Sequence, residues 1–474
     1  MVTVVVDQNP TPSNAGPNQS VCGLTTTLAG NTPSLGIGTW TQVSGPGTIT
    51  FANINSPSTS VTASTFGNYV LQWTINNGSC STSSTVSITF DEMPVPSAAG
   101  SDTAICGLTI NLNGNTPNVG AGAWSMQSGP GTITFGNSSS ATSSATASTY
   151  GTYTLTWTFT NGACSNSDNV DITFDEMPNT ADAGLDDAIC GLTLTLNANA
   201  ANIGTANWSQ LSGPGTLTFS NSSLNTSSVI ASAYGTYTAS WTIVNGVCST
   251  SDNVSLTFDE MPNAASAGLN DSICGLITNL GGTQTNIGVS TWSQLSGPGT
   301  TTFTNPNQHN SAISVTTSGL YEYVLTIVNG TCVTSDTVSH HFFDAPTPVN
   351  AGADTAVCAL NLNLNAQNPS LGTGIWTQIS GPVSATISNP TNINSLFDAT
   401  QYGNYTLVWN VINGVCTISD TVNVRLDQTP STALAGIDTT ICTNDYILDG
   451  NIPAVGFGVW TTTTAGIFYE RLNF

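Results

Sequence analysis

Cysteine is the chemically reactive residue that recurs most regularly in this chain of 474 residues. The eleven cysteines form two series with a constant step, namely Cys22, Cys106, Cys190, Cys274, Cys358 and Cys442, and Cys80, Cys164, Cys248, Cys332 and Cys416. Regular pairs of this kind indicate disulfides formed in an oxidising compartment. Zinc sites would use closely spaced Cys-x-x-Cys pairs, which the sequence does not contain.

Acidic residues are the second candidate for binding chemistry. They cluster near the ends of the repeated units, and the set is Asp91, Glu92, Asp102, Asp175, Glu176, Asp186, Asp259 and Glu260. Carboxylate oxygens suit Ca²⁺, so a calcium ion held at these positions would stiffen the connections between units. The alternative is that these residues are solvated carboxylates at strand ends.

Histidine provides no repeated site. His309, His340 and His341 all fall within one unit, and we expect them to be surface residues without a metal-binding or catalytic role. Adjacent residues in a strand point to opposite faces, so His340 and His341 would face opposite ways. The sequence indicates no repeated Ser–His–Asp set and no close pair of acids in a pocket, and we expect a protein that is not an enzyme and needs no cofactor, with calcium as the one candidate.

A constant 84-residue interval organises the whole chain. It separates tryptophans at positions 40, 124, 208, 292, 376 and 460, and prolines at positions 10, 94, 178, 262, 346 and 430. We therefore divide the chain into repeats 1 to 5, which cover 11–94, 95–178, 179–262, 263–346 and 347–430. Residues 1–10 match the final strand of a preceding repeat, and 431–474 match the first half of a sixth, as in a piece cut from a longer array.

Alternating polarity within each repeat predicts β-strands. In YTLTWTFT, Tyr153, Leu155, Trp157 and Phe159 share one face, while threonines occupy the other. An Asn-Gly pair follows, which favours a hairpin, and Val170, Ile172 and Phe174 then alternate again. About seven short strands per repeat predict an all-β chain of antiparallel immunoglobulin-like β-sandwiches, joined head to tail in a rod. A continuous β-solenoid is the alternative.

The order of the strands bears on how the cysteines pair. Cys22 would lie at the start of the second strand and Cys80 beyond the end of the sixth. These strands run in the same direction in an immunoglobulin sandwich, which places the two thiols roughly 25 Å apart. A disulfide requires Cα atoms within about 7 Å. The topology thus favours pairing between successive repeats: Cys22–Cys164, Cys106–Cys248, Cys190–Cys332 and Cys274–Cys416.

Pairing within each repeat remains open at this stage. It would join each cysteine of the first series to the next cysteine of the second: Cys22–Cys80, Cys106–Cys164, Cys190–Cys248, Cys274–Cys332 and Cys358–Cys416. Either scheme leaves an unpaired cysteine at the end of the chain. Disulfides of either kind would stabilise small domains with limited cores, by about 2–4 kcal/mol each.

Charge excludes several classes of partner. The chain has 26 acidic residues, two arginines and no lysine, for a net charge of −24. Such a surface repels nucleic acids and anionic lipids, so we expect neither nucleic-acid binding nor membrane insertion. The expected partners are the neighbouring repeats, further copies in a filament, and surface glycans or other cells.

The order AG-x-D-x-x-[IV]-C, L-x-L-x-G, G-x-W, YGTYTLTWT, NG-x-C and DEMP resembles the tandem immunoglobulin-like and PKD-like domains of very long secreted surface proteins of gliding and related Bacteroidota. The resemblance covers essentially the whole chain, although GTWTQVSGPG replaces the W-D-F-G-D element of PKD domains. It implies export, display on the cell surface and a role in adhesion, gliding or as a stalk. The O-glycosylation sequon of the same bacteria resembles the sequence around Thr103, Ser272, Thr337, Thr355, Thr421 and Thr439.

Two functional hypotheses follow. In the first, the chain is a structural segment of an extracellular cell-surface protein or filament that serves adhesion, attachment or gliding. In the second, it is a spacer or carbohydrate-binding array of a secreted polysaccharide-degrading enzyme. A threonine-rich array that binds ice or sugar is a third idea, but the threonine rows are short and interrupted.

Overall fold

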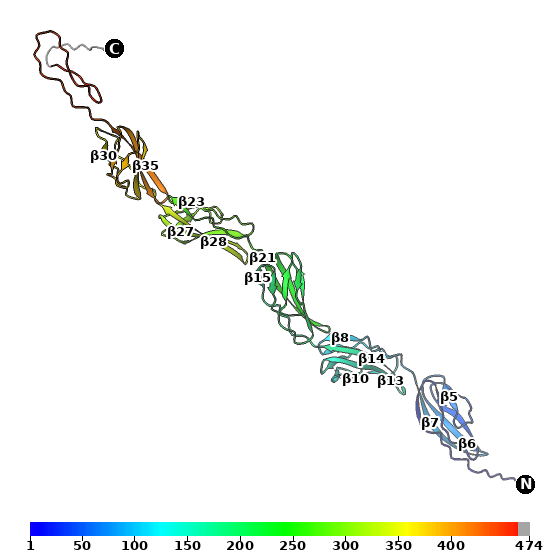
Figure 1. Ribbon diagram of the computed structural model, residues 1–474. Coiled ribbons are helices and arrows are strands. Elements are labelled where there is room, and N and C mark those ends of the chain that lie inside the picture. Colours follow the sequence, from blue (N-terminus) through cyan, green and yellow to red (C-terminus); the bar gives the residue numbers. More distant parts are fainter. Residues whose placement is uncertain (463–474) are drawn as a thin grey trace. The chain divides into compact units, whose positions relative to one another are not determined.

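The computed structural model describes residues 1–462, which contain β-strands and no α-helix (Figure 1). None of the described residues forms a helix that is long and apolar enough to cross a membrane. Each of repeats 1 to 5 folds into a β-sandwich of a four-stranded and a three-stranded sheet. By its internal contacts the chain separates into two compact units, residues 1–188 with 192–258, and residues 189–191 with the chain from 259 onward.

The seven strands of a repeat have nearly the same lengths in every copy. Repeat 1 contains β1 (Gln19–Cys22), β2 (Thr25–Thr27), β3 (Ile37–Ser44), β4 (Ile49–Phe51), β5 (Ser60–Ala63), β6 (Gly67–Asn77) and β7 (Cys80–Asp91). Repeat 2 contains β8 (Thr103–Cys106), β9 (Thr109–Asn111), β10 (Ala121–Ser128), β11 (Ile133–Phe135), β12 (Ser144–Ala147), β13 (Gly151–Asn161) and β14 (Cys164–Asp175). Repeat 3 contains β15 (Asp187–Cys190), β16 (Thr193–Thr195), β17 (Thr205–Ser212), β18 (Leu217–Phe219), β19 (Ser228–Ala231), β20 (Gly235–Asn245) and β21 (Cys248–Asp259).

Repeats 4 and 5 follow the same plan. Repeat 4 contains β22 (Asp271–Cys274), β23 (Ile277–Asn279), β24 (Val289–Ser296), β25 (Thr301–Phe303), β26 (Ala312–Val315), β27 (Gly319–Asn329) and β28 (Cys332–Phe343). Repeat 5 contains β29 (Thr355–Val357), β30 (Asn361–Asn363), β31 (Thr373–Ser380), β32 (Thr386–Ile387), β33 (Leu396–Asp398), β34 (Gly403–Asn413) and β35 (Cys416–Leu426).

The strand order is that of an immunoglobulin-like sandwich. In repeat 1 the larger sheet has the order β1-β7-β6-β3 and the smaller one β2-β5-β4. All pairs are antiparallel except the first, because β1 runs parallel to the end of β7, with Cys22 opposite Asp91. The long hairpin of β6 and β7 turns at Asn77–Cys80, where Gly78 adopts the positive φ that the Asn-Gly turn requires.

The alternating residues that the sequence places inward form the core. Tyr153, Leu155, Trp157 and Phe159 of β13 are at most 1% exposed, as is Phe174 of β14, so the predicted faces are confirmed. In each repeat a tyrosine at the start of the sixth strand donates its hydroxyl to the carbonyl four residues earlier, for example Tyr153 to Thr149 O at 3.0 Å. Such a tyrosine corner is typical of immunoglobulin-like folds.

A loop covers the open edge of the larger sheet. The backbone NH of Trp40, in edge strand β3, donates to Ile54 O at 2.8 Å, and Asn55 Nδ2 donates to Gly38 O at 2.9 Å. The NH of the equivalent tryptophan is bonded in the same way in the other four repeats. Covered edge groups cannot pair with a strand of another molecule, which disfavours sideways aggregation through this edge.

Two predicted strand segments differ from the structure. Residues 1–10 form no strand, in contrast to the expected final strand of a preceding repeat. Residues 431–462, within the predicted partial repeat 431–474, also contain no strand, and residues 463–474 lie outside the described part. The reason is the same at both ends: the hairpin partners that complete such a sheet in repeats 1 to 5 are missing from these short segments.

Candidate functional site

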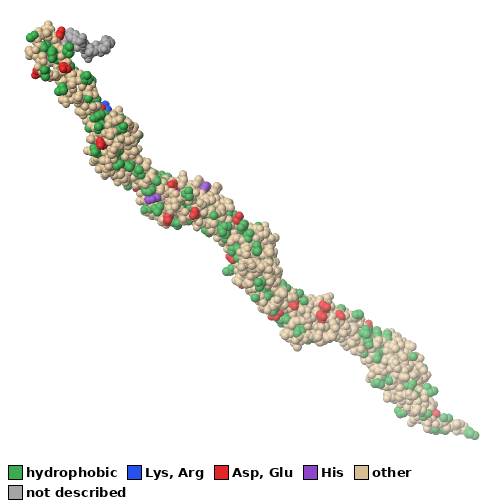
Figure 2. Space-filling view, in the orientation of Figure 1, with side chains coloured by type: hydrophobic (Ala, Val, Ile, Leu, Met, Phe, Trp, Pro, Cys, Tyr) green, Lys and Arg blue, Asp and Glu red, His purple; other side chains and the backbone are tan. Residues whose placement is uncertain are grey.

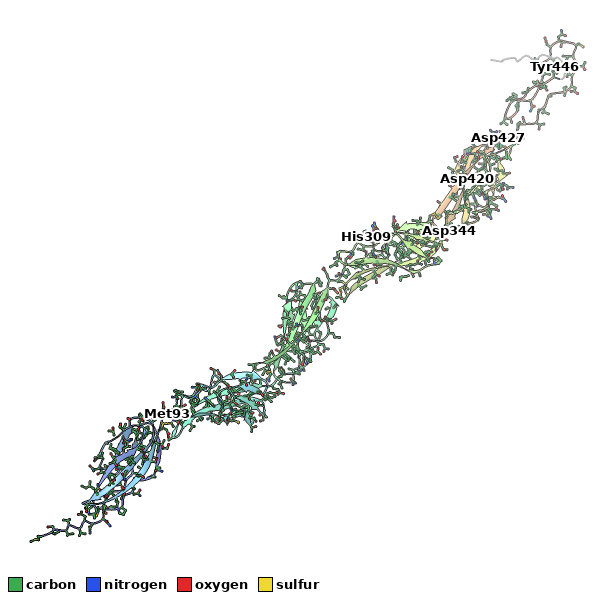
Figure 3. All side chains as sticks on the ribbon, turned by 180° about the vertical axis from the view of Figure 1, so that it is seen from behind. Met93, His309, Asp344, Asp420, Asp427 and Tyr446 are labelled. Atoms are coloured by element: carbon green, nitrogen blue, oxygen red, sulfur yellow. A yellow bond between two sulfur atoms is a disulfide. The ribbon has the colours of Figure 1, made fainter. Side chains whose placement is uncertain are left out.

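The candidate site is the junction, which we define as the end of one repeat's last strand together with the hairpin turn of the next repeat. At the first junction β7 ends at Asp91, beside Cys22 at the end of β1, and the turn Asn161–Cys164 of repeat 2 lies against them. Met93 marks this position in Figure 3. The parallel pairing of β1 with β7 brings Cys22 to the end of its repeat, where it meets the first residue of β14.

Disulfides join successive repeats at the junctions. The four bonds are Cys22–Cys164, Cys106–Cys248, Cys190–Cys332 and Cys274–Cys416, with Cα–Cα distances of 4.9, 5.1, 4.9 and 5.0 Å. They are the pairs that the strand topology favours. The three remaining cysteines, Cys80, Cys358 and Cys442, are free.

Pairing within a repeat is incompatible with the observed register. In repeat 2, Cys106 lies opposite Asp175, the last residue of β14, whereas Cys164 is the first residue of that strand. The two cysteines are therefore separated by the length of β14, roughly 35 Å at about 3.3 Å per residue. A disulfide between them would require the sheet to come apart.

An aspartate at each of the first four corresponding positions caps the hairpin turn that follows. Asp91 Oδ2 accepts a hydrogen bond from the backbone NH of Ala163 at 2.7 Å, and the side chain of Asn161 donates to Glu92 O at 2.9 Å. The same carboxylate-to-turn bond joins Asp7 to Ser79, Asp175 to Val247 and Asp259 to Thr331. The backbone NH and the hydroxyl of Ser79 both donate to Asp7 and lower the pKa of that carboxyl.

The turn glycine makes this contact possible. Gly162 has a φ of +57°, and any side chain there would collide with the carboxylate of Asp91. The Asn-Gly pair therefore serves two purposes, because it closes the hairpin and leaves room for the aspartate of the preceding repeat.

The predicted calcium residues occupy separate positions. Asp102 Oδ1 accepts from the backbone NH of Asp171 and Asp186 Oδ1 from that of Ser255, both at 2.8 Å, away from the capping aspartates. Among residues 1–462, no three His, Cys, Asp or Glu side chains come together as a group that could hold a metal ion. Glu92, Glu176 and Glu260 contribute backbone carbonyls to the junctions. Calcium binding therefore stays a prediction without a preformed cage.

On the face of the chain that Figure 2 shows, acidic side chains do not gather into one patch. Figure 2 shows red atoms scattered over a mostly uncharged face of the chain. The six predicted O-glycosylation residues are all exposed.

Sequence reasoning missed a second carboxylate that repeats. Asp168 Oδ2 accepts from the backbone NH of Ala99 at 2.8 Å, and this bond ties the segment that enters repeat 2 to β14. Asp252, Asp336 and Asp420 make the same bond in repeats 3 to 5. The signal was present, since a Ser-Asp pair recurs at the repeat interval in these four repeats. In repeat 1 the position is Ser84, whose hydroxyl is buried without a partner.

The expectation that all histidines lie on the surface is wrong for His340. His340 is 5% exposed and faces the core of repeat 4, with its ring 6.0 Å from that of Tyr323 and 6.4 Å from that of Phe342. Its Nδ1 is buried without a hydrogen-bond partner, and burial lowers its pKa. His341 faces the other side of the strand, as expected, because His340 takes the inward position that Ile172 holds in repeat 2.

Comparisons with known proteins give structural likeness alone. No protein-family model matches the chain, and no curated protein matches it. A three-domain immunoglobulin fragment of titin is 14% identical, with a TM-score of 0.32, and covers 54% of this chain and 99% of its own. Sidekick-1 immunoglobulin domains 1–5 are 12% identical, with a TM-score of 0.25. The match covers 89% of this chain and 100% of the Sidekick-1 chain. Extracellular domains 3–5 of Drosophila OTK are 10% identical, with a TM-score of 0.28, and cover 53% and 96%.

These scores are too low to carry an argument, so the fold assignment depends on the strand order and the tyrosine corners. The four disulfides indicate that the chain folds in an oxidising compartment. The chain is a tandem array of immunoglobulin-like β-sandwich repeats in which disulfides connect each repeat to the next.

Proposed function

We propose that this chain is a structural segment of an extracellular cell-surface protein or filament that serves adhesion, attachment or gliding. The observation that carries the proposal is that all four disulfides join successive repeats and none closes a single repeat. Bonds of this kind strengthen the connection between domains, which is the property that a tether under load needs.

The recurring features support a mechanical role. The capping aspartate, the turn glycine and the disulfide return at corresponding positions. The polar side chains that the loops repeat, such as the buried hydroxyl of Ser143 and its equivalents, bond to the backbone of their own repeat. An array that binds a ligand in each repeat would present the same pocket each time. Here the repeated covalent bonds lie where one repeat meets the next.

Surface labelling combined with gene deletion tests the proposal. An antibody raised against this chain should label intact, unpermeabilised cells of the organism that encodes it. Deletion of the gene should reduce attachment to a surface or gliding over it. Labelling that requires permeabilised cells would contradict the proposal. A deletion that abolishes polysaccharide hydrolysis and leaves attachment intact would favour the spacer of a secreted enzyme.

A further inference from the structure

In repeats 1, 2, 4 and 5, two segments of the larger sheet cross the repeat side by side in the same direction. In repeat 2 these are the segment 95–106, which ends in β8, and the last strand β14. The pairing is parallel, so both segments finish at the same end, with Cys106 opposite Asp175. The equivalent parallel pairs are β1 with β7, β22 with β28, and β29 with β35.

Each disulfide links the end of one such segment to the start of another. Cys106 ends the entry segment of repeat 2 and is bonded to Cys248, the first residue of the last strand of repeat 3. That strand continues through the peptide chain into the entry segment of repeat 4, which ends at Cys274 and is bonded to Cys416. A second path of the same kind runs from Cys22 to Cys164, and from Cys190 to Cys332.

We infer that the array contains two parallel covalent tracks that carry tension past the hydrophobic cores, so that unfolding an interior repeat adds no length. One track runs through 1–22, 164–190 and 332–474, and the other through 1–106, 248–274 and 416–474. Each track amounts to roughly two-fifths of the 474 residues. Both tracks contain only the entry segment or the last strand of repeats 2, 3 and 4, and the rest of each of these repeats lies outside them.

The lengths of the segments explain why the tracks resist extension. The stretch from Cys164 to Cys190 crosses the last strand of one repeat and the entry segment of the next. Fully extended it measures about 90 Å, at about 3.3–3.6 Å per residue, and the strand part is already extended in the fold. A whole repeat such as 95–178 that unfolded without disulfides would measure about 280–300 Å when fully extended.

Hydrogen bonds hold the two tracks together inside the repeats. The Asp168 carboxylate on β14 accepts from the NH of Ala99 on the entry segment, and the same bond recurs in repeats 4 and 5. The ladder between β8 and β14 adds further bonds along the same line. Residues 107–163, which contain most of the core of repeat 2, lie off both tracks within that repeat.

Force spectroscopy on the full oxidised chain, held by tags at its two termini, tests this inference. Repeats 2, 3 and 4 should produce no length-releasing step while repeat 1 or repeat 5 stays folded. Repeats 1 and 5 are each bypassed by one track, so at most two steps should appear. After reduction with a phosphine, five steps should appear, each releasing most of a repeat. The fully extended length should rise about 2.8-fold, because the whole chain replaces the shortest covalent path of roughly a third, which runs through 1–22, 164–190, back along 274–332 and out through 416–474.

Three or more steps in the oxidised chain would overturn the inference. Unfolding on reduction is a separate possibility, so hydrogen exchange of the reduced, unloaded chain must first show that the repeats remain folded. The double variant Cys106→Ser/Cys248→Ser cuts one track, and the interior repeats should still release nothing because the other track remains. The inference goes beyond the proposed function, since an array whose interior repeats lengthened could still act at the cell surface.

Discussion

Repeats 2 and 4 build the same strands around different cores. In repeat 2, Trp157 packs on Trp124 with ring centroids 4.8 Å apart, and Leu155 precedes it on the same face. Repeat 4 has Tyr323 and Leu325 at these positions, so the aromatic ring moves two residues along the strand. The sandwich tolerates the exchange because the volume buried by the strand is nearly retained.

The exchange adds polar atoms to the core of repeat 4. Tyr323 shares a hydrogen bond with Thr301 Oγ1 at 3.1 Å, so its hydroxyl is satisfied. The neighbouring His340 has no such partner on Nδ1. The same scaffold therefore holds one apolar core that is independent of pH near neutrality and one that contains a titratable group.

The junctions that follow repeats 2 and 4 differ as well. Asp175 at the end of repeat 2 caps the turn of repeat 3, whereas Phe343 takes this position in repeat 4 and its ring lies against Gly414. Phe343 also packs on His341, with ring centroids 4.0 Å apart. The disulfide Cys274–Cys416 is present without the carboxylate, so the covalent connection does not depend on the cap.

Exchanging the core residues should have the largest effect. Trp157→Leu gives repeat 2 the residue of repeat 4 and leaves a cavity beside Trp124, so we expect the free energy of unfolding of repeat 2 to fall by about 3 kcal/mol. The double variant Leu155→Tyr/Trp157→Leu should recover part of this loss. Hydrogen exchange of β13 amides in the full chain measures both, with the outward-facing Thr156→Ser as the control. Unchanged protection in Trp157→Leu would show that the tryptophan pair does not hold the core.

Acid should weaken repeat 4 selectively. Burial lowers the pKa of His340 in the folded state, so the unfolded chain binds the proton first as the pH falls. Stability is therefore lost as the pH falls below about 6.5, by at most about 1.4 kcal/mol per pH unit. Asp271, on the neighbouring strand, favours the charged form of His340 and opposes the effect of burial only in part, while burial raises the pKa of Tyr323.

Hydrogen exchange of repeat 4 relative to repeat 2, followed from pH 7.5 to 5.5, measures this difference. His340→Ile should remove the pH dependence, because Ile is the residue of repeat 2 at this position. His341→Thr, which gives the outward-facing residue of repeat 2, should leave it unchanged. A parallel response of repeats 2 and 4 would contradict the assignment of the effect to His340.

Removing a junction cap should have a smaller effect. Asp175→Ala deletes the acceptor for the Val247 NH, and we expect that amide to lose protection worth about 1 kcal/mol. Glu176→Ala is the matched control, since only the backbone carbonyl of Glu176 bonds to the next repeat. Phe343→Asp should create the missing cap and protect the NH of Val415. If the Val247 amide exchanges at the same rate in Asp175→Ala and Glu176→Ala, the carboxylate of Asp175 does not protect that amide.

Calcium should have the smallest effect. The capping aspartates already accept backbone NH groups, and the residues that the structure describes form no preassembled cluster of three ligands. We expect isothermal titration of the chelator-treated chain to give no saturable heat at micromolar calcium. A stoichiometric site that disappears in Asp175→Ala would restore the calcium hypothesis.

The regular features of the fold were predictable because they follow the two-residue alternation within strands and the 84-residue repeat. Strand faces such as Tyr153 to Phe159 follow from alternation, and the disulfides between repeats follow from the direction of two strands. The orientation of His340 was not recognised, because its surface assignment ignored the inward position that alternation gives it. The Asp168 bond escaped notice because a carboxylate beside a serine resembles ordinary surface sequence until the register with Ala99 is known.

Peptide mapping of the unreduced chain tests the central claim most directly. The chain has two arginines and no lysine, so digestion requires a protease other than trypsin, at acidic pH to suppress disulfide exchange. Linked peptides should contain Cys22 with Cys164 and the three corresponding pairs, while Cys80, Cys358 and Cys442 should react with an alkylating reagent before reduction. A linked peptide that contains Cys22 and Cys80 would contradict the account.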